Sequence, residues 1–131
     1  MAKRPAGPVL KVRKTIPYEF VLEALMPLSP RTRPMFGCHA VYIGPRIVFI
    51  LRDRPDYPKD NGVWLATTAE HHESLLQEFP NMRSLGLFGK EVTHWQILPS
   101  DSSSFESSVM RACDFVLAKD PRIGKLPKHR G

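Results

Sequence analysis

The pattern of apolar and polar residues along the chain predicts three helices. The first runs from about Pro17 to Leu25 or Met26, where apolar residues recur at helical spacing and proline suits the first turn. The second begins at Thr67-Thr68-Ala69-Glu70, which has the form of a capping box, and ends at Pro80. The third begins near Ser103, at a second capping-box pattern. Its buried face is predicted to hold Phe105, Val109, Ala112, Cys113 and Val116.

Strand patterns fall between these helices. The five predicted strands are Cys38–Ile43, Arg46–Arg52, Val63 to Ala66 or Thr67, Arg83–Phe88 and Val92–Leu98. Gly44-Pro45 and Gly89-Lys90-Glu91 are turn signals between neighbouring strands, 53–62 is expected to be a loop, and the proline-rich stretch 29–34 to be irregular. The predicted fold class is therefore α+β, a two-layer antiparallel sheet with three helices in the order α-β-β-β-α-β-β-α.

Length and charge refine this picture. The 131 residues fit one domain, which we expect to span residues 15–118 between a mobile basic tail at 1–14 and a basic tail at 119–131. The formal net charge is +6, but the two ends contribute +5 and +4, whereas the middle contributes −3. Basic tails attract nucleic acids and anionic surfaces in a salt-dependent manner, and they also aid solubility.

Cysteine usage and hydropathy point to a cytoplasmic protein. Cys38 and Cys113 are far apart and lack C-x-x-C spacing, which is typical of reduced thiols in that compartment. The longest purely apolar run, Ile47–Leu51, is far shorter than the ~20 residues of a membrane-spanning helix. We see no secretory signal, and we expect no membrane association.

No set of residues forms a convincing catalytic or metal site. His71 and His72 are adjacent on a predicted helix and point ~100° apart, so they do not share one ion easily. The aspartates of the 53–62 loop are too widely spaced for a calcium loop. We therefore predict no metal and no cofactor, and we favour a protein that is not an enzyme.

One alternative is an enzyme or small-ligand binder. Cys38 and His39 point to opposite faces of a strand, so a Cys–His pair would need a histidine from elsewhere. His94 is the available donor, and a groove formed by Cys38, Tyr42, His94 and Gln96 is the predicted ligand site.

A second alternative is a nucleic-acid-binding protein. Five arginines flank the first two predicted strands and could join the basic tails in one positive surface, namely Arg31, Arg33, Arg46, Arg52 and Arg54. The chain carries no RNP, helix-turn-helix or zinc-finger signature.

The segment Pro34-Met35-Phe36-Gly37, followed by Tyr42 in a strand and the Gly44 turn, resembles the opening of TfoX N-terminal domains. The predicted element order over residues 16–118 is similar to that of the related YjbR-like domains. The resemblance implies a regulatory or interaction module, with links to competence regulation and nucleic-acid binding, and it supplies no catalytic residues.

The residues of this motif also have a structural interpretation. We expect Gly37 to turn the chain into the first strand, and Met35 and Phe36 to plug the end of the sheet core. The expected partner is another protein, and exposed strand edges favour a homodimer.

Overall fold

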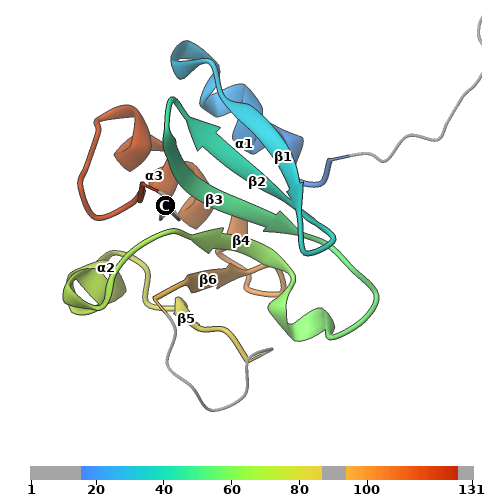
Figure 1. Cartoon of the computed structure of the whole chain (residues 1–131). Coiled ribbons are helices and arrows are strands. Elements are labelled where there is room, and N and C mark those ends of the chain that lie inside the picture. The colour runs from blue at the N-terminus through green and yellow to red at the C-terminus, as the bar shows by residue number, and fades with distance from the viewer. Residues whose placement is uncertain (1–15, 87–93, 127–131) are drawn as a thin grey trace, which may run out of the picture.

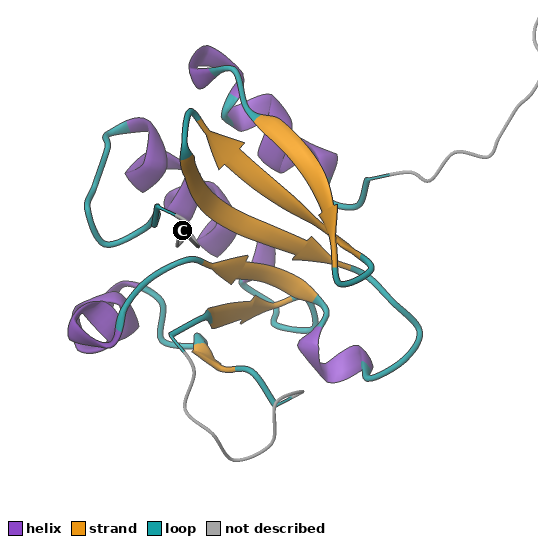
Figure 2. Ribbon diagram, viewed as in Figure 1, coloured by secondary structure: helices purple, strands orange, loops and turns teal. Residues whose placement is uncertain are grey.

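The computed structural model describes residues 16–86 and 94–126 as one antiparallel sheet with helices packed against it (Figures 1 and 2). The α-helices are α1 (Glu19–Ala24), α2 (His72–Glu78) and α3 (Phe105–Leu117). The strands are β1 (Arg31–Met35), β2 (Cys38–Ile43), β3 (Arg46–Arg52), β4 (Gly62–Leu65), β5 (Arg83–Ser84) and β6 (Gln96–Pro99). The sheet order is β1-β2-β3-β4-β6-β5. The predicted α+β class is confirmed.

Strand β1 was not predicted, because its two neighbouring prolines indicated an irregular linker. It forms the edge of the sheet and pairs with β2 from Arg31↔Tyr42 to Met35↔Cys38. In a hairpin with a two-residue turn, the residue pair next to the turn exchanges backbone hydrogen bonds, and the following pair does not. Met35 and Cys38 are the first pair, and Pro34 and His39 are the second. The N–H that Pro34 lacks would therefore not have bonded to β2, because the Pro34 nitrogen faces away from that strand. Proline is tolerated here because β1 is an edge strand.

The two faces of the sheet are buried in different ways. One face packs against the helices, and its cluster includes Val41, Phe49 and Leu65 with Leu25 from the first helical segment and Val109 from α3. Figure 1 shows α1 and α3 behind the sheet. The other face carries a second cluster without α-helical residues: Cys38, Ala40, Tyr42, Ile47, Ile50, Trp64, Ala66, Leu85 and Ile97. The uninterrupted apolar run of β3 thus serves both faces of a central strand.

Helix α3 buries the predicted face, with Val109, Ala112, Cys113 and Val116 inside and Phe105 half-buried. Neither predicted capping box forms. The N-cap residues are Thr68 for the 3₁₀ turn before α2 and Ser104 for α3, and neither makes a side-chain capping hydrogen bond. Thr67 is instead 1% exposed, and its hydroxyl donates to the Thr68 carbonyl oxygen at 3.5 Å.

The second predicted hairpin is only partly present. β5 is limited to Arg83 and Ser84, which pair with Ile97 and Gln96 of β6. The predicted turn at Gly89-Lys90-Glu91 lies outside the described residues.

Residues 119–126 belong to the folded domain, which corrects the predicted boundary at residue 118. Ile123 is 5% exposed and joins the core cluster of the helical face. Ile47 and Lys125 exchange two backbone hydrogen bonds of 2.9 Å, and the Gly124 amide donates to the Ala66 carbonyl oxygen at 2.7 Å. No helix within residues 16–86 and 94–126 is both long and apolar enough to cross a bilayer.

Candidate functional site

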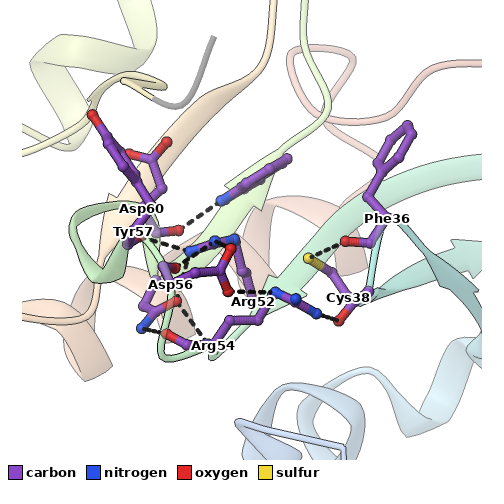
Figure 3. A network of polar contacts seen from close by, with 10 residues as sticks. Phe36, Cys38, Arg52, Arg54, Asp56, Tyr57 and Asp60 are labelled. Atoms are coloured by element: carbon purple, nitrogen blue, oxygen red, sulfur yellow. Dashed lines mark hydrogen bonds and ion pairs between the residues drawn. The ribbon is translucent and has the colours of Figure 1, made fainter.

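Arg52, the last residue of β3, organises the loop that follows it. Its side chain is 2% exposed. One terminal nitrogen donates to the Tyr57 carbonyl oxygen at 2.9 Å and to Asn61 Oδ1 at 2.8 Å, and the other donates to the Asp56 carbonyl oxygen at 2.8 Å (Figure 3). A buried charge is tolerated only with such partners. Arg52 is therefore not part of a nucleic-acid surface, and that prediction was wrong.

Asp60 is a second buried charge in the same loop, with 0% exposure. Its Oδ1 accepts hydrogen bonds from Arg83 at 3.1 Å and from the Gly86 amide at 3.2 Å, and its carbonyl oxygen accepts one from Trp64 at 3.0 Å. Arg83 also donates to the Lys59 carbonyl oxygen. These contacts attach the 53–61 loop to β4, to β5 and to the segment after β5.

The β1–β2 hairpin tip lies beside this loop. Phe36 and Gly37 have φ angles of 54° and 75°, which is the pattern of a two-residue type I′ turn. The Gly37 carbonyl oxygen accepts a hydrogen bond from Arg54 at 3.2 Å, and Arg54 also pairs with Asp56 at 2.9 Å. A Cβ atom on Gly37 would collide with the Arg54 guanidinium. Glycine is therefore required for both the turn and the close approach.

Phe36 is 77% exposed. Figure 3 shows it pointing away from the charged network. Met35 packs against the second cluster as expected, but the prediction that Phe36 plugs the sheet core was wrong.

Three aromatic residues near this end of the sheet adopt the left-handed backbone region: Tyr18, Phe36 and Tyr57, with φ of 56°, 54° and 47°. Each of them forms a hydrogen bond with Arg52 or Cys38. The Tyr18 hydroxyl donates to the Arg52 carbonyl oxygen at 3.0 Å, and the Tyr57 carbonyl oxygen accepts from the Arg52 side chain. The Phe36 carbonyl oxygen accepts from the Cys38 thiol at 3.5 Å. Such conformations cost about 1–3 kcal/mol each and concentrate at functional sites. Sequence patterns did not reveal them, because Gly and Asn are the usual left-handed residues.

A cleft of about 610 Å³ opens next to the hairpin tip. Its lining residues are three prolines, the turn glycine, one leucine and four polar or charged residues: Pro17, Pro34, Pro55, Gly37, Leu51, Cys38, His39, Asp53 and Arg54. The walls come from the hairpin, from the end of β3 and from the segment before α1. The cleft therefore joins apolar surface to charges of both signs within one rigid frame.

Cys38 is not arranged as a nucleophile. Its side chain is 3% exposed, and burial raises the pKa of the thiol, which the Arg52 and Arg54 guanidinium groups oppose only in part. A reactive cysteine needs the reverse, a depressed pKa and exposure. Cys38 lies on the face of the second cluster, whereas His39 alternates to the helical face.

The predicted groove of Cys38, Tyr42, His94 and Gln96 does not assemble. Cys38 and Tyr42 share one face of β2, but β3 and β4 separate that strand from β6. Gln96 pairs with Leu65 of β4, so its side chain lies on the helical face, and its amide donates to Ser84 Oγ at 2.9 Å. His94 is exposed, and its carbonyl oxygen lies 3.2 Å from His72 Nε2.

The remaining predicted nucleic-acid arginines are dispersed. Arg31 and Arg33 are exposed on β1, with guanidinium carbons 5.7 and 5.9 Å from the Tyr42 ring centre. Arg46, opposite Ile43 at the start of β3, lies on the helical face, 3.4 Å from the Gly124 carbonyl oxygen. Arg54 lies in the 53–61 loop and contacts the hairpin tip. They form no single patch, although Arg31 and Arg33 remain together on the edge strand.

Within residues 16–86 and 94–126, no three His, Cys, Asp or Glu side chains gather closely enough to hold a metal ion. His71 instead lies 3.3 Å from Glu70. The hairpin tip itself carries an exposed phenylalanine beside the charged side chains of Asp53 and Arg54.

Comparison of the chain with protein-family models, with curated proteins and with solved structures finds no match.

Proposed function

We propose that this chain is a non-enzymatic interaction module that recognises a partner protein through the β1–β2 hairpin tip. The observation that carries the proposal is Phe36, which is 77% exposed although its backbone is held in the left-handed region. An aromatic residue is a poor choice for such a turn unless the ring itself is used. Exposed aromatic side chains are the usual anchors of protein interfaces.

Rigidity around the tip supports this reading. Arg54 is held by both Gly37 and Asp56, and Arg52 fixes the loop behind it. A site that is ordered before binding loses less conformational entropy on association. The cleft beside the tip, with its prolines and with Asp53 and Arg54, suits a partner segment that carries an apolar anchor next to charged residues.

The resemblance to TfoX N-terminal domains points in the same direction, because it implies regulation through binding. It remains a prediction from Met35-Phe36-Gly37 and Tyr42. Our proposal includes a cytoplasmic location, because Cys38 and Cys113 are both free and reduced thiols are typical of that compartment.

The test is a Phe36→Asn variant. Asparagine tolerates the left-handed region and favours the turn before glycine, so the fold is retained while the ring is removed. A matched control is Met26→Ala, which truncates another exposed apolar side chain, 59% exposed, on a different segment.

A partner is first captured from cell extract with the wild-type chain, then purified, and its affinity is measured for each variant. We expect Phe36→Asn to raise the Kd about 10-fold or more, as for an interface hot spot, while Met26→Ala changes it little. An equal Kd for the wild type and Phe36→Asn would overturn the proposal.

Nucleic-acid binding is a second candidate, favoured by Arg31 and Arg33 on one face of β1. Two exposed guanidinium groups beside an aromatic ring can contact a phosphate backbone. Titration of the full chain with generic single-stranded and duplex DNA at rising salt tests it. Binding that weakens with salt and weakens further in Arg31→Gln/Arg33→Gln supports it, and an absence of binding at low ionic strength excludes it.

A further inference from the structure

A second cavity, of about 390 Å³, lies at the opposite end of the sheet from the hairpin tip. Six of its nine lining residues are apolar, and they come from the first 3₁₀ turn, from β2 and β3, from α3 and from the C-terminal segment: Leu28, Ile43, Val48, Val116, Pro121 and Ile123. Small-molecule sites have volumes of roughly 300–1,000 Å³ with mainly apolar walls. The size and lining of this cavity match that class.

One wall of the cavity is fixed by backbone hydrogen bonds. The segment around Gly124 is attached to Ala66 and to Ile47 through the bonds at 2.7 and 2.9 Å described above. Because strand-like pairing holds residues 123–125 against the start of β3, the cavity is preformed.

The charged residues that line the cavity are Arg46, Lys119 and Asp120, and among the described residues only the carboxylate is paired with another side chain. Asp120 is occupied by Arg122, whose backbone amide and Nε donate to Oδ1 at 3.0 Å and whose terminal nitrogen donates to Oδ2 at 2.8 Å. Arg46 and Lys119, the other two charged lining residues, form no ion pair within residues 16–86 and 94–126. Two positive charges therefore border the apolar space without a carboxylate partner there.

Lys119 occupies a position that favours glycine. It follows the end of α3 with φ of 61°, its amide donates to Val116, and the Asp120 amide donates to Phe115, which together form a Schellman motif. These bonds also satisfy carbonyl groups of the last helical turn, which would otherwise repel an anion. A lysine here adds a positively charged residue to the cavity lining at some conformational cost.

We propose that this cavity binds a small amphipathic anion, a carboxylate that carries a short hydrocarbon chain or ring. The apolar body contacts Ile43, Val48, Val116 and Ile123, and the carboxylate pairs with Lys119 and Arg46. The site is separate from the hairpin tip and does not depend on the interaction proposed there.

The experiment is a titration of the full-length chain with octanoate, followed by NMR of methyl groups. Octanamide, which has the same chain length without the charge, is the matched ligand. We expect saturable octanoate binding with shifts concentrated at Ile43, Val48, Val116 and Ile123, and several-fold weaker binding of octanamide. Equal affinities for the two ligands, or no saturation by about 10 mM octanoate, would overturn the proposal.

Variants at residue 119 make the test specific. Lys119→Gly keeps the left-handed backbone and removes the charge, and we expect it to raise the octanoate Kd about threefold to tenfold, as for loss of a charge-assisted hydrogen bond. Lys119→Arg should retain the affinity, and Lys59→Gln, at an exposed lysine outside this lining, should leave it unchanged. Wild-type affinity in Lys119→Gly would contradict the proposed role of the ammonium group.

Discussion

The two ends of strands β2 and β3 use charge in opposite ways. At the hairpin-tip end, Arg52 and Asp60 are buried, and the aromatic ring of Phe36 is exposed. At the other end, apolar side chains surround a cavity, and Arg46 and Lys119 contribute the positive charges of its lining. Buried charge fixes a loop rigidly, so the first end can present a hydrophobic side chain in a defined position. The second end instead leaves apolar space that a ligand can fill.

The largest effect that would sharpen this comparison is expected for Arg52→Met. The substitution preserves much of the volume but removes three hydrogen bonds from a buried charged donor. The Asp56 carbonyl group loses its donor, whereas Asn61 Oδ1 and the Tyr57 carbonyl oxygen keep only the backbone amides of Arg54 and Asp60. We expect the free energy of unfolding to fall by about 3 kcal/mol or more. Urea denaturation at neutral pH measures it. Arg46→Met, at the exposed end, is the control and should change stability by at most ~0.5 kcal/mol, so similar losses would contradict the proposed difference.

Gly37→Ala and Gly44→Ala compare the two turns directly. Both glycines have positive φ, 75° and 57°, but a Cβ at Gly44 meets open space, whereas one at Gly37 displaces Arg54. We expect a loss of about 1 kcal/mol for Gly44→Ala and about 2 kcal/mol for Gly37→Ala.

The larger loss of stability in Gly37→Ala than in Gly44→Ala should disappear when both variants are compared in an Arg54→Ala background, which forms a double-mutant cycle. An excess that persists without Arg54 would show that the guanidinium contact is not its cause.

Relief of backbone strain should produce a smaller, opposite effect at both ends. Phe36→Asn and Lys119→Gly replace residues with φ of 54° and 61° by residues that adopt this region readily. Each should raise the free energy of unfolding by up to about 1 kcal/mol while weakening the binding assigned to its end. Thermal denaturation tests this, and a loss of stability would show that the native side chain also contributes to folding.

The smallest expected effect is the pH dependence contributed by Asp120. The Arg122 hydrogen bonds lower the pKa of this carboxyl from its ordinary value of 3.8. A depressed folded-state pKa contributes stability above the ordinary value and loses it as the pH falls through the folded pKa.

At pH 7 the free energies of unfolding of Asp120→Asn and the wild type should differ by less than about 1 kcal/mol. Denaturation measured from pH 7 to 2 should show the two free energies converging below pH 3.8. Parallel curves over this range would contradict the linkage.

Much of the fold was predictable from local patterns. The bounds of Cys38–Ile43 and Arg46–Arg52 were correct because apolar runs on both sides of Gly44-Pro45 leave little ambiguity. The edge strand was missed because proline is a poor strand residue except where its nitrogen faces outward, and the pairing partner decides that orientation. Ile123 was missed because a single apolar residue in a polar segment has no periodicity.

The candidate sites were much harder to predict. Loop 53–61 has the composition of an exposed turn, yet Asp60 is buried because Arg83, 23 residues away, pairs with it. Arg52 directly follows the apolar run Ile47–Leu51, and that position was the one available signal that its side chain is buried. The cavity lining comes from five separated segments, so only tertiary packing reveals it.

Pro34 has a consequence for how this domain can meet other chains. Since Pro34, next to the last residue of β1, has no amide hydrogen on the outward-facing side, an incoming strand cannot complete a regular ladder along that edge. The homodimer expected from exposed strand edges would therefore need another surface. Recognition at this side of the domain must read side chains, so it should discriminate between partner sequences instead of accepting any extended backbone.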